Sequence, residues 1–433
     1  MDLRRRRGWV ERVPVRAGER GRVALSAFYF FALLSSYSIL RPVRDEIGVR
    51  AGVSKVPWLF TGTLASMLLL VPVFGWISSR FARRRFLPGI QFFFAGNLAL
   101  FAAVLGRPGA ARLAAPAFFI WVAVFNLFAV SLSWSLMSDL YRGEQARRLF
   151  GIVAAGGSLG ALAGPAAMAA LAPRVGTGRL LFAASILLAA CAGTARVLQA
   201  GVQRSGEAPL EAPIGGATLA AIRRTLRSRF LLVIALTLVC YTTLSTLLYF
   251  SQTELVGAAI HGSGERVALF ARMDLAVNAL TILFQLFVAG PLIRRAGVGG
   301  ALAIVAAAVT AGVLILGFVP ILTTVVAVQI LHRVGHFGVG RPARETLFVA
   351  LDVEDRYKSK SFIDTAVYRG SDAASAWLLG LFRSQGLGLA QTALLCVPVG
   401  VVWAAASWWL GGAGEAAADG ERGASAAERL EPA

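Results

Sequence analysis

Long apolar runs recur along the whole chain, and they limit its possible folds more than any other feature. About twelve segments of roughly 18–25 residues are rich in hydrophobic side chains, which is the length that an α-helix needs to cross a bilayer core about 30 Å thick. Hydrophobic residues make up 57% of the 433 residues. Because lipid offers the backbone no hydrogen-bond partners, such segments are stable there only as helices or closed barrels. We therefore expect an all-α polytopic membrane protein.

The predicted spans form two groups of six. They lie near residues 23–40, 57–79, 86–105, 114–140, 149–172, 179–200, 230–256, 267–293, 297–318, 320–340, 361–383 and 388–410. We expect six-helix bundles at 23–200 and 230–410, joined by a central cytoplasmic loop at 201–229 that is rich in Gly, Pro and charge. Residues 1–22 form a basic cytoplasmic tail, and the Ala, Gly and Glu-rich residues 411–433 are expected to be a disordered cytoplasmic tail.

The net charge of +20 is explained by topology. Arginines cluster in alternate loops, as the positive-inside rule requires, and this pattern places both termini in the cytoplasm. A nucleic-acid partner is therefore not expected. The scarcity of lysine beside abundant Ala, Gly and Arg is typical of a GC-rich bacterial genome, so we expect the inner membrane. The exception to the charge rule is the first outside loop, which holds Arg41, Arg44, Arg50 and Lys55.

Several function classes find no support in the sequence. No lysine follows a glycine, so the phosphate-binding P-loop pattern is missing. The three cysteines fall inside apolar runs, where they are expected to pack as small hydrophobic residues. No nucleophile–base set and no metal-ligand spacing stands out. We therefore expect neither an enzyme nor a cofactor.

The stretch from Gln329 to Asp372 places ionisable groups deep inside predicted spans. These groups are His332, Arg333, His336, Arg369 and Asp372. At about 1.5 Å per residue, Arg333 and Asp372 lie roughly 15–20 Å from the start of their helices. That depth is near the middle of a bilayer, where charged side chains are costly and usually line a pathway or pair with each other.

These groups allow two interpretations. Arg333 and Asp372 are either a buried pair that joins two helices or part of a transport pathway. His332 and His336 titrate near neutral pH and could carry a coupling proton, or they could be hydrogen-bonded structural residues. Asp364 and Asp372 share one face of their helix and could present acid groups to a cavity.

Two further charge clusters lie at the ends of predicted spans. Arg41, Arg44 and Asp45 follow the first span, where two guanidiniums at an outside mouth could bind phosphate or carboxylate. The alternative is a helix end with compensating charges. Asp139 and Arg142 end the fourth span, either as a gating network or as solvated charge.

Glycine spacing and polar residues give information on helix packing. Gly156, Gly160 and Gly164 lie on one helix face, which favours close packing against a neighbour over a hinge. Polar side chains concentrate in spans one, four, seven and ten, and Ser, Thr and Tyr groups of the first, fourth and seventh spans are expected to orient a substrate.

The two halves of the chain resemble each other. Gly75 to Arg85 ends the second span and Gly290 to Gly297 ends the eighth, each with clustered arginines. The first of these segments resembles the loop motif of the major facilitator superfamily. Two parallel six-helix repeats with a site between them are the layout of that fold, in which spans one, four, seven and ten line the cavity.

Three further segments resemble the ATP/ADP translocases of plastids and intracellular bacteria. They are Ile39-Leu-Arg-Pro-Val-Arg-Asp-Glu46, Glu144-Gln-Ala-Arg-Arg-Leu-Phe-Gly151 and the run from Ala343 to Arg369. The resemblance implies nucleotide exchange across the membrane by alternating access. The transport lysine of that family's first span aligns with Arg44, which keeps the charge.

Other charges of that family are not kept. Its acidic residue of span four aligns with Trp121 or Val122, and that of span seven with Tyr249. Its lysine of span eleven aligns with Asp372, which reverses the sign. The chain is thus similar to a divergent bacterial branch with an altered site.

We therefore predict a secondary transporter that exchanges nucleotides or another organic anion. The residues expected to bind substrate are Arg41, Arg44, Tyr249, Arg333 and Arg369, and those expected in coupling or gating are Asp45, Asp139, His332, His336, Asp364 and Asp372. The alternatives are a proton-coupled carrier of another small solute and a non-transporting membrane scaffold.

Overall fold

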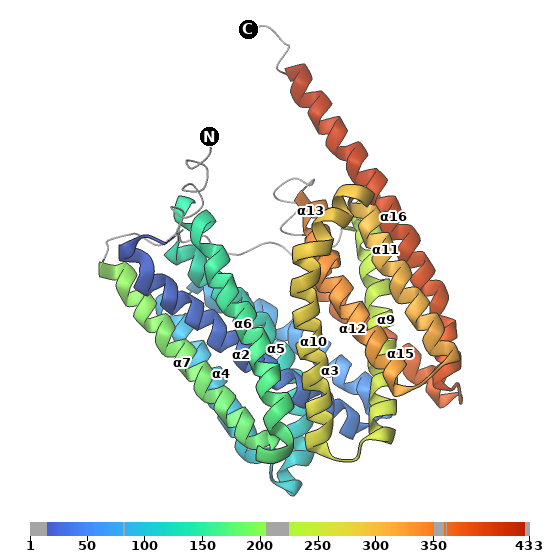
Figure 1. Ribbon diagram of the computed structural model, residues 1–433, viewed down its shortest axis with the longest axis horizontal. Helices are drawn as coiled ribbons and strands as arrows, with labels where there is room; N and C mark the ends of the chain where they lie inside the picture. Colours follow the sequence, from blue (N-terminus) through green and yellow to red (C-terminus); the bar gives the residue numbers. More distant parts are fainter. Residues whose placement is uncertain are drawn as a thin grey trace, which may run out of the picture. The chain divides into compact units, whose positions relative to one another are not determined.

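The computed structural model describes residues 15–80, 83–141, 143–204, 225–349, 359–360 and 362–428. Within these ranges almost every residue is helical (Figure 1). The helices are α2 (Arg20–Ala51), α3 (Val56–Arg80), α4 (Arg83–Val104), α5 (Pro108–Leu140), α6 (Gly143–Val175), α7 (Thr177–Arg204), α9 (Arg229–Ala259), α10 (Ser263–Phe284), α11 (Gly290–Phe318), α12 (Leu322–Gly335), α13 (Arg341–Val349), α15 (Tyr368–Ser384) and α16 (Leu389–Glu428). The expected all-α class is confirmed.

Nine stretches of the described residues are long and apolar enough to cross a membrane. One of them, Ser263–Phe318, contains two spans, because the chain breaks at Gly297 with φ 69° and ψ 175°, a conformation open to glycine. Two further spans, around α12 and α15, are divided by π-helical turns into pieces of 14 and 17 residues. Counting these gives the twelve spans expected from the sequence.

In the described part of the second half, three π-helical turns interrupt the helices. They are η3 (Gln285–Ala289), η4 (His336–Gly340) and η5 (Ile363–Val367). Such turns insert an extra residue and are frequent at functional sites. Two of them carry residues singled out by the sequence, since η4 begins at His336 and η5 contains Asp364.

Two helices run beyond their predicted ends. The first span is α2, which continues through the Arg41–Glu46 cluster to Ala51 with Pro42 inside it, so this cluster is helical and not an outside loop. The last helix, α16, continues to Glu428, and the expectation of a disordered tail at 411–433 stays a prediction. The central loop prediction falls mostly on residues 205–224, and the basic tail mostly on residues 1–14, outside the described ranges.

The chain divides into two compact units, and each takes in a segment from the other half of the sequence. Unit 1 contains the first 46 residues, residues 72–214 and the first part of α10, residues 262–275. Unit 2 contains residues 47–71, 215–261 and 276–433. Within unit 2, α11 packs on α16, and α9 contacts α12, α15 and α16. Within unit 1, α4 packs on α7.

A row of glycines lets α6 approach α2 closely in unit 1. A Cβ atom at Gly156 would lie 2.3 Å from the carbonyl oxygen of Ala27, and one at Gly160 would lie 2.3 Å from that of Phe31. Gly164 has the same relation to Ser35 at 2.6 Å. The predicted packing role of these glycines is therefore confirmed, since a side chain at any of them would collide with backbone.

Candidate transport site

The centre of unit 2 is an aromatic cluster built around Tyr241 of α9. The Tyr241 ring stacks on the imidazole of His332, with centroids 4.6 Å apart, and on that of His336, at 4.2 Å. Trp403 of α16 meets the Tyr241 ring edge-on at 5.9 Å, and Tyr368 of α15 lies 6.3 Å away. Four helical segments thus place polar-edged rings around one side chain. The sequence singled out both histidines but not Tyr241 as their partner.

The two histidines differ in their surroundings. His332 is completely buried, and neither ring nitrogen makes a hydrogen bond of normal geometry to the described residues, although the Tyr241 backbone interacts with the ring. His336 opens the π turn η4 and lines a cavity within unit 2. Buried polar groups without good partners are costly, so their retention marks a site where another role is served.

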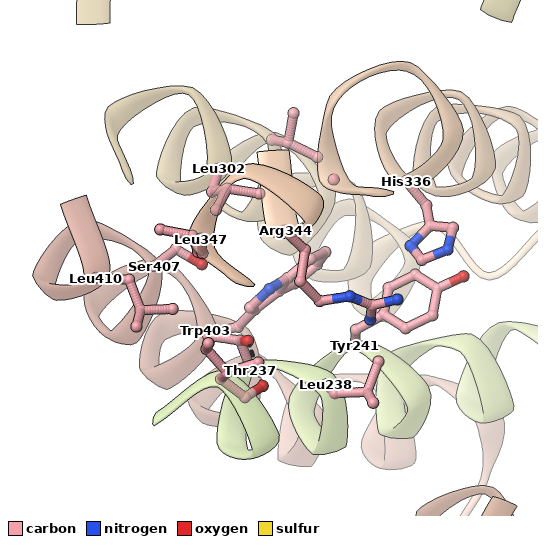
Figure 2. A pocket seen from close by; sticks show the side chains of 13 residues that line it. Thr237, Leu238, Tyr241, Leu302, His336, Arg344, Leu347, Trp403, Ser407 and Leu410 are labelled. Carbon is pink, nitrogen blue, oxygen red and sulfur yellow. Dashed lines mark hydrogen bonds between the residues drawn. The ribbon is translucent and has the colours of Figure 1, made fainter. Parts of the chain in front are cut away.

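Figure 2 shows this cavity from close by. Its polar lining comes from Thr237, Tyr241, His336, Arg344, Trp403 and Ser407. The side chain of Arg344 extends from α13 across the cavity toward the rings of Tyr241 and His336 (Figure 2). Arg344 belongs to the run from Ala343 to Arg369 that carries the family resemblance, and its sequence context predicted no role for it.

Arg344 also forms an ion pair with Asp364, one of the acidic residues that the sequence singled out in the second half. Its Nη2 atom lies 3.0 Å from Oδ1 of Asp364 in the π turn η5. Next to it, Lys360 pairs with Glu345. Asp364 was expected to face a cavity in a coupling role; the structure pairs it with the arginine that lines one.

Asp372 pairs with a neighbour on its own helix. Its Oδ2 lies 3.3 Å from Nη1 of Arg369, one turn earlier, and the two side chains are 14% and 26% exposed. Arg333 is buried at 8% exposure, and Arg333 and Asp372 both act electrostatically on the Tyr241 hydroxyl. The predicted groups Arg333, Arg369 and Asp372 thus converge near Tyr241, and a transport role for them stays a prediction.

Arg41 and Arg44 of α2 form a second cationic group, in unit 1, which we call the arginine group of α2. Arg44 lies 3.4 Å from Asp45, with its guanidinium 4.8 Å from the centre of the Phe119 ring. Arg41 lies 4.0 Å from Asp274 of α10 and 6.0 Å from the centre of the Tyr37 ring. Both arginine side chains are about a quarter exposed, at 23% and 24%. An accessible guanidinium beside an aromatic face can bind an anion and a planar group together.

Two buried carboxylates in unit 1, Glu46 and Asp274, had no role predicted from the sequence. Glu46 accepts a hydrogen bond from Arg266 of α10 at 2.9 Å, and Asp274 is 2% exposed. Asp274 carries the same signal as Asp372, an acid group inside an apolar span. Applying that rule to every span would have found it.

Tyr249 lies at the far end of α9, in unit 2. The centre of its ring is 5.5 Å from that of Phe60 of α3. A Cβ atom added to Gly48 would lie only 2.0 Å from the Tyr249 hydroxyl oxygen. On α15, the Trp377 indole donates to Thr61 at 2.9 Å, and Arg383 pairs with Glu254. The surroundings of Tyr249 are contacts between the end of α2, the start of α3 and α9, and substrate binding by Tyr249 stays a prediction.

Many hydroxyls expected to orient substrate are used in helix packing instead. Ser35 donates to the Gly160 carbonyl at 3.1 Å, and Ser36 donates to that of Ala184 at 3.0 Å. Tyr29 pairs with Ser133, while Thr242 pairs with Ser371. In an apolar surrounding these bonds satisfy the hydroxyls and hold helices together. The sequence pattern could not distinguish this use from a cavity lining.

The remaining predicted residues are placed as follows. Trp121 stacks on Phe125 at 5.3 Å in an aromatic cluster between α4 and α5, so this position of the resemblance is filled by packing. Asp139 is half-buried near the end of α5. Its expected partner Arg142 lies outside the described residues.

Arginines, histidines and carboxylates buried inside helical membrane spans are typical of substrate, ion or proton pathways. The sequence profile of the Major Facilitator Superfamily matches residues 23–340, and the chain belongs to this superfamily. The expected superfamily architecture is confirmed. No curated relative matches the sequence.

Solved structures share the fold at low sequence identity. A bacterial homologue of the human lysosomal transporter Spinster, inward-facing and unoccupied, is 14% identical with a TM-score of 0.57, covering 92% of this chain and 98% of that one. The nucleoside transporter NupG is 13% identical with a TM-score of 0.58, covering 91% and 98%. A POT family transporter in complex with a thioalcohol-conjugated peptide is 12% identical with a TM-score of 0.60, covering 89% and 94%.

Proposed function

We propose that this transporter exchanges organic anions by alternating access, with nucleotides of the ATP and ADP type as the first substrates to test. The observation that carries the proposal is the arginine group of α2. Arg41 and Arg44 sit inside a spanning helix, are about a quarter exposed, and lie beside the rings of Tyr37 and Phe119. Guanidiniums bind phosphate well, and aromatic rings can stack on a nucleobase.

The resemblance to ATP/ADP translocases supports the same substrate class. It rests on the segment that contains Arg44 and on the run from Ala343 to Arg369, which includes Arg344 and Asp364. Arg333 and Arg369 would supply further positive charge in unit 2. Asp45 and Asp372 would compete with the substrate for these arginines, which would couple substrate release to binding of the next anion.

The test is uptake of labelled ATP into proteoliposomes that are preloaded with ADP. We expect saturable exchange by the wild type and a loss of about tenfold or more, about 1.4 kcal/mol, in Arg44→Ala. Arg44→Lys, which restores the residue of the resembling family, should retain much of the rate. Arg50→Ala, at the exposed end of the same helix, is the matched control. Folded wild-type protein without exchange would overturn the nucleotide proposal.

A second candidate is a proton-coupled carrier of another small solute. It is favoured by Asp372, a partly exposed acid group inside a span, close to His336 through the shared neighbour Tyr241. An inward current on acidification that is lost in Asp372→Asn would support it. A scaffold without transport activity would instead tolerate Arg333→Ala with Asp372→Ala and change no flux.

The proposed location is a bacterial inner membrane with both termini in the cytoplasm. The alternation of arginine-rich loops supports this orientation. Fusions of green fluorescent protein and of alkaline phosphatase to the C-terminus test it. We expect fluorescence from the first fusion and no phosphatase activity from the second.

A further inference from the structure

The cavity inside unit 2 is separate from the arginine group of α2. It lies among α9, α11, α13 and α16, and its walls include Leu238 and Trp403 (Figure 2). Its volume is about 40 Å³. Because one water molecule needs roughly 10–15 Å³ of such space, the cavity holds one small ion with a water or two and is far too small for a nucleotide.

Two polar groups on the cavity wall have no hydrogen-bond partner among the described residues. Ser407 is 1% exposed, and its hydroxyl makes no hydrogen bond. The Nε atom of Arg344 is likewise buried without a hydrogen bond, although the Nη2 atom of the same guanidinium faces Asp364. Buried donors of this kind call for a ligand or ordered water. The two residues come from α16 and α13, and both line the cavity.

The charge around the cavity selects the sign of its ligand. Among the described residues, those that line the cavity include Arg344 but no carboxylate. Arg344 and Arg341 both interact electrostatically with His336, so two positive charges lie close to this side of the cavity. Asp364 contacts Arg344 but is not itself a lining residue. A small space with a positive field, free donors and apolar walls favours a monovalent anion over a cation.

We propose that this cavity binds a small inorganic anion of chloride size, held by the Arg344 guanidinium and the Ser407 hydroxyl. The Trp403 indole and the Thr237 hydroxyl complete the polar wall. The bound anion would offset the positive charge of α13 against α9 and α16. This site does not depend on the substrate proposed for Arg44.

The experiment measures the melting temperature of purified protein, without nucleotide, in sodium chloride and in sodium gluconate at equal ionic strength. We expect chloride and bromide to raise the melting temperature saturably, while gluconate, which does not fit, has no such effect. Ser407→Leu fills the cavity with apolar volume and should abolish the difference between the salts. Ser384→Ala, on the exposed end of α15, should leave it unchanged.

Two further variants keep the test decisive. Ser407→Ala keeps the space and removes only the donor, so it serves as the test if Ser407→Leu fails to fold. It should raise the half-saturating chloride concentration by about tenfold. Arg44→Ala should retain the whole chloride effect even if it abolishes nucleotide exchange. Equal melting temperatures of the wild type in both salts would show that the cavity holds only water and overturn the proposal. A chloride effect that keeps the wild-type half-saturating concentration in both Ser407 variants would also overturn it.

Discussion

Arg266 of α10 donates a hydrogen bond to Glu46 of α2 at 2.9 Å, and it joins residues 220 positions apart in the sequence. Both side chains are well buried, at 13% and 3% exposure. The pair lies where α2 approaches its end and α10 begins, inside unit 1. It therefore links the first half of the sequence to the second.

Breaking this pair from one side should destabilise the protein strongly. Glu46→Gln removes the carboxylate that the Arg266 guanidinium contacts in this buried pair, and we expect a loss of about 3–5 kcal/mol in the free energy of unfolding. Glu46→Gln combined with Arg266→Gln should recover most of the loss, because the two amides can bond to each other. Thermal unfolding in detergent measures both, and strictly additive effects would contradict the prediction.

The close approach of α6 to α2 should not tolerate a methyl group. Gly160→Ala places Cβ 2.3 Å from the Phe31 carbonyl oxygen, so we expect a loss of about 1–3 kcal/mol. Gly193 of α7 provides the matched control, since nothing lies within 4 Å of a Cβ there. Gly193→Ala should be neutral or stabilising by about 0.4–1 kcal/mol. Equal melting temperatures for the two variants would show that α6 is free to move away from α2.

A collision at Gly48 should be relieved by a change on another helix. Gly48→Ala puts Cβ 2.0 Å from the Tyr249 hydroxyl oxygen, which must then move. We expect lower thermal stability in Gly48→Ala and partial rescue by Tyr249→Phe, because the next ring atom is 3.0 Å away. Tyr249→Phe alone measures the cost of losing the hydroxyl. If the double variant is no more stable than Gly48→Ala, the contact is not the cause.

The segment that precedes α2 should be held in place in a pH-dependent way. The Arg148 side chain donates to Glu19 at 2.8 Å and keeps the pKa of that carboxyl below its usual value of 4.5. A carboxyl with a lowered pKa stabilises the attached state above its usual pKa, and this contribution is lost as the pH falls through the lowered value. The attachment should therefore be complete at neutral pH and weaken below about pH 4.5.

A fluorescent label on a cysteine introduced at Gly18 reports this attachment. The three native cysteines are buried, and a side chain at Gly18 meets nothing within 4 Å. We expect the fluorescence to change between about pH 5 and pH 3 in the otherwise native chain. In Glu19→Gln the label should report a loose segment at every pH. A pH response that survives in Glu19→Gln would assign it to another group.

The helical fold could be read from the sequence because the bilayer imposes a simple rule. Apolar runs of fixed length and alternating arginine-rich loops follow directly from the hydrocarbon core and its potential. The rule says little about helix ends, so α2 runs eleven residues past its expected end at residue 40 to Ala51. The positive charge of Arg41 and Arg44, which seemed to indicate a loop, is accommodated on a helix by Asp45, Asp274 and aromatic faces.

The site was harder to predict because contacts between distant residues decide it. Span depth singled out His332, Arg333 and Asp372, and the structure brings all three near Tyr241. The depth of a residue in its span could not show that the hydroxyls of Ser35 and Ser36 donate hydrogen bonds to backbone carbonyls of α6 and α7. It also could not place Arg344, since a charge near a span end is ordinarily solvated.

The π turn η4 stores one residue more than an α-helical path between His336 and α13 would need. If its hydrogen bonds changed to the α-helical pattern, every residue beyond Gly340 would advance by one position, a rotation of about 100° around the helix axis. That rotation would carry Arg344 away from Tyr241 and Asp364 without breaking the helix. The orientation of Arg344 around its helix axis therefore depends on how this single turn of backbone is wound.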